Sequence, residues 1–90
     1  MKSDLKPDVC VVGLGYIGLP TATLFASRRK KVIGVDVNAY AVDTINQGRI
    51  HIVEPELDML VQAAVHGGYL RATLTPEPAD AYLIAVPTPF

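Results

Sequence analysis

Three glycines near the amino terminus have the spacing of a site for a nucleotide phosphate. Gly13, Gly15 and Gly18 form the pattern GxGxxG, which follows a short apolar run and precedes a helical pattern. In such a turn the first glycine permits a tight bend and the second lets the backbone approach a pyrophosphate. The third lets the helix pack close to the strand. The backbone amides of Tyr16 and Ile17, at the positive end of the helix dipole, are expected to face the phosphate.

An acidic residue follows at the distance that such a site requires. Asp36 lies 21 positions after Gly15 and comes directly after a second apolar run at 32–35. A carboxylate at this place accepts hydrogen bonds from the hydroxyls of an adenosine ribose and repels a 2′-phosphate. The next residues, Val37 and Asn38, offer no arginine for such a phosphate, so the predicted cofactor is NAD rather than NADP. The alternative is that the glycines only make a tight turn in a sheet that binds nothing.

Apolar runs and helical spacing predict the elements around this turn. Strands are expected at 9–12, 32–35, 70–74 and 81–86, and the first two have the composition of strands buried on both faces. Helices are expected between them. The predicted helices are 16–29, a segment capped by Asn38 and stopped by Gly48, and a segment that begins at Glu54-Pro55 and ends at Gly67-Gly68.

Each predicted helix has an apolar face that must pack on the strands. These faces are formed by Ile17, Leu24 and Phe25 with Ala22 and Ala26 as small packing residues, then by Ala39, Val42 and Ile45, and last by Leu57, Leu60, Val61, Ala64 and Val65. Because parallel strands need crossovers, the order β-α-β-α-α-β-β predicts an α/β fold. It is a Rossmann-type parallel sheet, the first half of a doubly wound NAD-binding domain, and a half-sheet leaves one edge unpaired. The link 75–80 fits this scheme poorly, since it is shorter than a usual crossover.

Composition excludes several classes of protein. The 90 residues are 50% hydrophobic and 19% charged with a net charge of -1, so we expect a packed domain that binds neither nucleic acid nor membrane. No apolar run reaches the roughly 18 residues of a membrane helix. Residues 1–8 form a polar leader without the apolar core of a signal peptide, which predicts a cytoplasmic protein. Residues 9–90 are then the N-terminal part of the NAD-binding domain.

No catalytic or metal-binding residue is predicted in this chain. Cys10 lies inside the first predicted strand, where a thiol acts as a small inert hydrophobe rather than as a nucleophile. His51 and His66 lack partners at the spacing of metal ligands. The chemistry of these 90 residues is therefore predicted to be the binding of a cofactor.

Four segments of the chain resemble the nucleotide-sugar 6-dehydrogenases, the UDP-glucose/GDP-mannose dehydrogenase family. They are GLGYIGLP at 13–20, VIGVDVN at 32–38, HIVEPEL at 51–57 and LIAVPTPF at 83–90. The first two occur in many NAD-binding domains, whereas the pair EPxL and VPTP is more specific to this family. The stretches at 41–46 and 70–73 resemble the branch of the family that acts on UDP-N-acetyl-D-mannosamine.

The resemblance implies a two-step oxidation of the sugar's C6 primary alcohol to a carboxylate with two NAD. The product is then UDP-N-acetyl-D-mannosaminuronate, a precursor of surface polysaccharide such as enterobacterial common antigen. Tyr16, Ile17, Asp36 and Thr88 are implied to contact NAD. The family's catalytic cysteine and UDP-sugar pocket lie beyond the matched segment, so we expect a fragment that alone does not oxidise sugar. Family members are commonly homo-oligomers.

Two alternatives to this function remain at the level of sequence. A non-catalytic regulatory module that binds a dinucleotide uses the same glycine pattern and acidic strand end, although it is not expected to contain EPxL and VPTP. A dehydrogenase of the same family acting on another nucleotide sugar, such as UDP-N-acetylglucosamine, UDP-glucose or GDP-mannose, is the other alternative, because this segment contains no sugar pocket.

Overall fold

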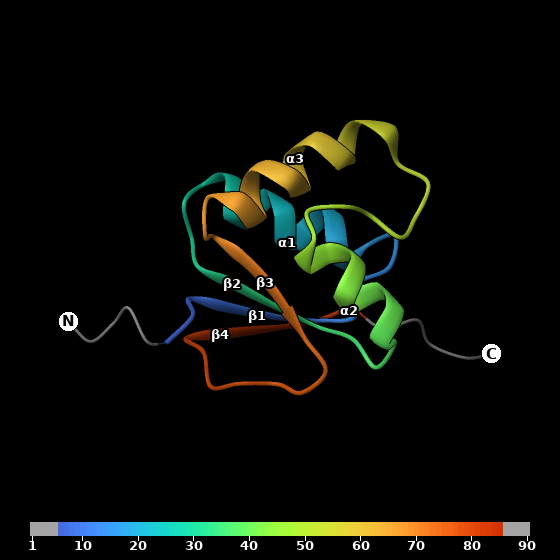
Figure 1. Cartoon of the computed structure of the whole chain (residues 1–90). Coiled ribbons are helices and arrows are strands. Elements are labelled where there is room, and N and C mark those ends of the chain that lie inside the picture. Colours follow the sequence, from blue (N-terminus) through green and yellow to red (C-terminus); the bar gives the residue numbers. More distant parts are fainter. Residues whose placement is uncertain (1–5, 86–90) are drawn as a thin grey trace.

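A computed structural model describes residues 6–85, which form a parallel four-stranded sheet with three helices against one of its faces (Figure 1). The strands and helices follow the predicted order. They are β1 Val9–Val12, α1 Gly18–Ser27, β2 Val32–Val35, α2 Ala39–Asn46, α3 Pro55–His66, β3 Leu70–Thr73 and β4 Ala81–Ile84. The predicted α/β class is confirmed, and so are the cap at Asn38 and the helix start at Pro55.

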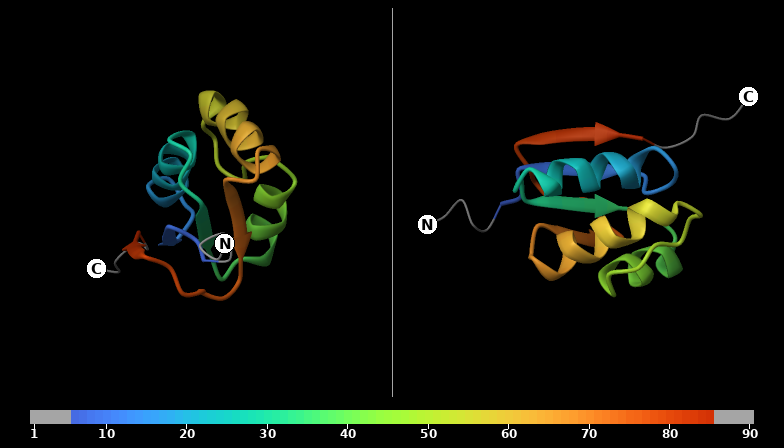
Figure 2. Two further views of the ribbon diagram at one scale, coloured as in Figure 1. Left: turned by 90° about the vertical axis from the view of Figure 1, so that its left-hand side faces the viewer. Right: turned by 90° about the horizontal axis from the view of Figure 1, so that it is seen from above.

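The strands pair in the order β3-β2-β1-β4, and all of them run in the same direction (Figure 2). Val9 of β1 pairs with Val32 of β2 on one side and with Ala81 of β4 on the other. The chain therefore builds the sheet outward from β1 to β3 and then returns to the opposite side of β1. Ligands of open α/β sheets bind at the carboxyl ends of the strands where this reversal occurs.

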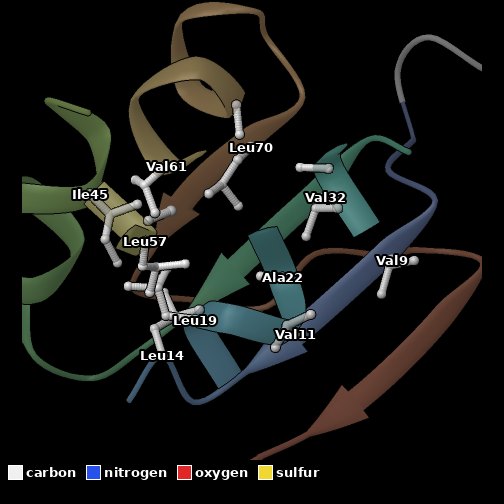
Figure 3. Packing of buried hydrophobic residues seen from close by; sticks show 13 residues of the cluster. Val9, Val11, Leu14, Leu19, Ala22, Val32, Ile45, Leu57, Val61 and Leu70 are labelled. Carbon is white, nitrogen blue, oxygen red and sulfur yellow. The ribbon is translucent and has the colours of Figure 1, made fainter. Parts of the chain in front are cut away.

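Alternate residues of the strands pack on opposite faces of the sheet. Val9 and Val11 belong to the main buried cluster, which joins the sheet to all three helices (Figure 3). Cys10, Ile33 and Val35 pack together on the face opposite the helices. Cys10 is completely buried, which agrees with its predicted place inside a strand.

The predicted helix faces are wrong in part. Ile17, Leu24 and Leu60 are 71%, 55% and 52% exposed, and Ala39 is exposed as well. In α1 the buried positions are Gly18, Leu19, Ala22, Thr23 and Ala26, of which Ala22 and Ala26 are the predicted small packing residues. These buried positions form one stripe along the helix, and Leu24 lies off it.

Buried threonines account for another part of the difference. Thr23 of α1 and Thr44 of α2 are 1% and 7% exposed. Each hydroxyl donates a hydrogen bond to the carbonyl four residues earlier, that of Leu19 or Tyr40, at 2.8 and 2.7 Å. Because the hydroxyl is satisfied within the helix, its burial carries little penalty, and a search for apolar residues alone does not find such positions.

The short link at 75–80 crosses the face of the sheet opposite the helices (Figure 1). The eight Cα–Cα steps from Thr73 to Ala81 reach at most about 28 Å. Crossing three strand spacings and returning along a short strand needs only about 18 Å. An extended link is therefore sufficient without a helix, and the strand predicted at 70–74 is confirmed as β3.

Side chains fix the link in place. The Arg71 guanidinium donates two hydrogen bonds to the Glu77 carboxylate, at 2.9 and 3.1 Å. The Tyr82 hydroxyl donates to the Glu77 carbonyl at 3.1 Å and accepts from the Ala79 amide at 3.0 Å. Ala79 itself packs against the Cys10 cluster. The link thereby ties β3 and β4, the two outer strands of the described sheet, to each other.

The outer strand β4 has little cover within the described residues. All four of its residues are exposed, and Tyr82, Leu83 and Ile84 are 52%, 37% and 67% exposed. Within residues 6–85, β4 pairs with β1 alone.

We expect the Arg71–Glu77 contact to stabilise the fold at neutral pH and to be lost in acid. The hydrogen bond between the two side chains lowers the pKa of Glu77 and raises that of Arg71. A carboxyl whose pKa is lowered in the folded state contributes stability above its unfolded-state pKa, and the contribution disappears as the pH falls through the folded-state value. Urea unfolding should therefore show Glu77→Gln to be less stable than the parent chain at neutral pH.

In acid the two chains should have the same free energy of unfolding, because the parent's Glu77 is then protonated as well. If Glu77→Gln matches the parent chain at neutral pH, this ion pair does not hold the link.

Candidate dinucleotide-binding site

The turn that contains the three glycines is held by the conformation of Gly13 and by hydrogen bonds from the amides of Gly13 and Leu14. Gly13 has a φ of 99°, a left-handed conformation that favours glycine. Its amide donates a hydrogen bond of 2.7 Å to the Val35 carbonyl. The next amide, that of Leu14, donates to the Asp36 carboxylate at 2.9 Å. The turn that leaves β1 is thus fixed to the carboxyl end of β2.

The three glycines of the pattern have different roles. A Cβ on Gly18 would overlap the Gly13 carbonyl, so Gly18 allows α1 to start directly against the turn. A Cβ on Gly15 would meet nothing within 4 Å, and Gly15 does not have a positive φ. Packing and conformation within residues 6–85 therefore account for Gly13 and Gly18 but not for Gly15. A bound ligand close to the backbone would account for it.

The helix begins two residues later than predicted, and this affects the site. The sequence predicted a helix from Tyr16, whereas α1 begins at Gly18 with Ile17 as its N-cap residue. An isoleucine side chain cannot cap, and no side-chain hydrogen bond caps this end. Within residues 6–85 the amides of Gly15, Tyr16 and Ile17 have no hydrogen-bond acceptor. Unpaired amides at the positive end of a helix form a site for an anion.

The Asp36 carboxylate is half-buried beside this turn and already accepts two hydrogen bonds. One oxygen accepts from Leu14, and the other accepts from the Asn38 amide at 2.9 Å. Because a carboxylate has about four lone-pair positions, two remain for the hydroxyls of a ribose. The Asn38 side chain is engaged elsewhere, since it accepts from the amides of Tyr40 and Ala41 at the start of α2.

A cleft of about 340 Å³ lies between the glycine turn and the carboxyl ends of the strands. Gly15 and Asp36 line it, together with Val37 beyond β2 and Ala85 beyond β4. Of the predicted residues, the structure thus brings Gly13, Gly15 and Asp36 to one cleft, at the point where the strand order reverses. The lining does not include Tyr16, Ile17 or Gly18. Thr88, the remaining predicted contact, lies outside the described residues.

Sequence reasoning missed two contacts of the turn. The Leu14 side chain is completely buried, although it occupies a variable position of the glycine pattern. The Tyr16 hydroxyl accepts a hydrogen bond from the Val53 amide at 3.3 Å and so connects the turn to the segment before α3. No signal in the sequence predicts the second contact, because the two residues are 37 positions apart.

The described residues contain no group of three or more histidine, cysteine, aspartate or glutamate side chains that could hold a metal ion. None of the helices within 6–85 is long and apolar enough to cross a membrane.

Comparison with known proteins agrees with this geometry. Residues 7–90 match the sequence profile of the UDP-glucose/GDP-mannose dehydrogenase family, NAD binding domain. The chain belongs to this family. Its cofactor is therefore NAD, as the glycine pattern and Asp36 predicted.

The curated relatives include two kinds of dehydrogenase. The chain is 79% identical over 82 residues to an NDP-N-acetyl-D-galactosaminuronic acid dehydrogenase of Ralstonia nicotianae. It is 72% identical over 82 residues to a UDP-N-acetyl-D-mannosamine dehydrogenase of Yersinia pestis. Each match covers 91% of this chain, but only 19% and 20% of the relatives. The chain thus spans about one fifth of the length of these enzymes.

Solved structures of the family have the same fold. A UDP-N-acetyl-mannosamine dehydrogenase of Staphylococcus aureus superposes with a TM-score of 0.88 at 45% identity, over 91% of this chain and 20% of that one. A GDP-mannose dehydrogenase of Pseudomonas aeruginosa superposes with a TM-score of 0.84 at 38% identity, over 90% of this chain and 20% of that one.

Two glycine substitutions should distinguish a glycine that the fold requires from one that only a bound ligand would require. Gly18→Ala should lower the free energy of unfolding by about 1–3 kcal/mol, because the new Cβ meets backbone that cannot move aside alone. Gly15→Ala should leave it unchanged or raise it by up to about 1 kcal/mol, since the added methyl has free space and restricts the unfolded chain. Urea denaturation measures both.

Equal destabilisation by the two substitutions would show that the fold itself requires Gly15, and that no ligand is needed to account for it.

Proposed function

We propose that this chain forms the cofactor-binding start of an NAD-dependent nucleotide-sugar 6-dehydrogenase, which oxidises the primary alcohol at C6 of the sugar to a carboxylate. The observation that carries the proposal is a cleft lined by both Gly15 and Asp36, with unpaired amides at Gly15 and at the two residues that follow it. Among the described residues, no packing or backbone requirement explains Gly15, and a pyrophosphate lying against the backbone would.

In this proposal the chain's own residues bind and orient the cofactor. The amides of Tyr16 and Ile17 donate to the pyrophosphate, and the dipole of α1 stabilises its charge. The free lone pairs of Asp36 accept from the ribose hydroxyls, and Thr88 contacts the same cofactor. When bound, NAD accepts the hydride that leaves C6 of the sugar. The catalytic cysteine and the sugar pocket belong to the rest of such an enzyme, so the 90-residue chain alone releases no product.

The substrate that we propose is UDP-N-acetyl-D-mannosamine. The 72% identity to the Yersinia pestis enzyme of that name supports it, as do the segments at 41–46 and 70–73. The 79% identity to the Ralstonia nicotianae enzyme favours a second candidate, a nucleotide-linked N-acetylgalactosamine derivative. Both names describe an N-acetylated sugar, which is the common element of the two candidates.

The two substrates are distinguished by NADH formation in an enzyme that joins this chain to the remaining domains. We expect two NADH for each UDP-N-acetyl-D-mannosamine consumed, with UDP-N-acetyl-D-galactosamine as the parallel assay. Turnover of the galactosamine sugar alone would assign the chain to the second candidate. No turnover of any nucleotide sugar, with NADH still bound, would favour a non-catalytic module.

The Asp36→Ala substitution tests the ribose contact. NADH should bind at least about tenfold more weakly, because hydrogen bonds to a charged group are lost. NADPH should lose less affinity or gain some, since the repulsion of its 2′-phosphate is removed. The substitution also leaves the Leu14 and Asn38 amides without their acceptor, so stability falls as well.

The decisive readout is therefore the ratio of NADH to NADPH affinity, measured by fluorescence titration of folded protein. An equal loss for both cofactors would show that Asp36 is not at the ribose. The Gly15→Ala variant, which is expected to keep its stability, should lose NADH affinity if the pyrophosphate lies against the turn.

A further inference from the structure

Gly34 lies in the middle of β2, where a glycine is unfavourable. Gly34 is buried, and it pairs with Val11 of β1 on one side and with Ala72 of β3 on the other. A glycine inside a strand offers no side chain to the core and loses more backbone entropy than other residues on folding. Its φ is not positive, so the backbone conformation does not require glycine. The space that the absent Cβ leaves is the remaining reason for it.

The Leu14 side chain occupies that space. A Cβ on Gly34 would lie 2.7 Å from Cδ2, 2.9 Å from Cδ1 and 3.3 Å from Cγ of Leu14. Leu14 is completely buried in the same cluster as Leu19 and Ile45, so a shift of its side chain also affects these neighbours (Figure 3).

This contact is one of three that join the end of β2 to the glycine turn. Gly34 receives the Leu14 side chain, the Val35 carbonyl accepts from the Gly13 amide, and the Asp36 carboxylate accepts from the Leu14 amide. Three consecutive residues, the last two of β2 and the one directly after it, thus contact two consecutive residues of the turn. The position of Leu14 therefore determines the orientation of the Asp36 carboxylate and the place where the unpaired amides at 15–17 begin.

We propose that Gly34 is a positioning residue for the cofactor and acts through Leu14. The proposal rests on the proposed function, since it concerns the geometry of the same site. An added methyl at 34 must displace the Leu14 side chain, and in this proposal the Leu14 amide moves with it, away from the Asp36 carboxylate. The amides at 15–17 then move relative to the carboxylate, although the substitution is made in β2 and not in the turn.

The test compares Gly34→Ala with the double variant Gly34→Ala/Leu14→Val. Gly34→Ala should weaken NADH binding by about tenfold, the scale of the overpacking effect on a site. The double variant has the same number of side-chain carbons as the parent chain, because valine has one fewer than leucine. We expect it to bind NADH within about threefold of the parent, since volume-conserving exchanges are tolerated best.

A matched control adds a methylene group to the same sheet far from the turn. Val9→Ile enlarges a buried residue at the amino end of β1 and should leave NADH affinity unchanged, even if stability changes. A second readout follows the Leu14 amide resonance in ¹H–¹⁵N spectra. In the double variant residue 14 is a valine, so the Asn38 amide, which donates to the other Asp36 oxygen, is followed there as well. Both resonances should move in Gly34→Ala and stay constant in Val9→Ile, and the Asn38 resonance should return in the double variant.

The outcomes separate the two proposals. If the parent chain gives the spectrum of a folded protein but does not bind NADH, the proposed function fails first, and the positioning role fails with it. If the parent binds NADH and Gly34→Ala binds it equally well, only the positioning role is overturned. If Gly34→Ala does not fold, the double variant decides: folding with near-parental affinity supports the role, and failure to fold or to bind contradicts it.

Discussion

The hydrogen bond from the Leu14 amide to the Asp36 carboxylate is the contact on which the site depends. It joins the first turn of the chain to the end of the second strand, across 22 positions of sequence. A carboxylate that accepts from main-chain amides is fixed in orientation before any ligand arrives, so its free lone pairs point in a defined direction. The same bond fixes Leu14, directly before the unpaired amides at 15–17. The carboxylate and the amides are thus positioned by one hydrogen bond.

The sheet supplies the framework for that anchor. Because β1 lies between β2 and β4, the carboxyl ends of three strands surround the glycine turn. The return of the chain to the far side of β1 requires only the short link at 75–80, which Arg71, Glu77 and Tyr82 hold against the sheet. The link therefore contributes to the cleft indirectly, since it fixes the strand that leads to Ala85.

The elements and the core of the site could be predicted from the sequence because each has a local signal. Apolar runs mark the strands, Asn38 and Pro55 mark helix starts, and the glycine spacing with Asp36 marks the turn and its partner. The buried faces of the helices could not be predicted in full, since Thr23 is satisfied within its helix and the buried stripe of α1 runs through Leu19 rather than Leu24. The contact between the Leu14 side chain and Gly34 depends on tertiary packing, so the glycine pattern alone does not predict it.

The central claim is that the chain builds a turn whose unpaired amides take up the pyrophosphate of NAD. The most direct measurement is a titration of the ¹⁵N-labelled 90-residue chain with NADH, followed by its ¹H–¹⁵N correlation spectrum. We predict saturable shifts centred on the amides of Gly15, Tyr16 and Ile17, with a smaller response at Asp36. A dispersed spectrum of a folded chain in which these amides do not move, or in which saturable shifts lie away from the turn, would contradict the account.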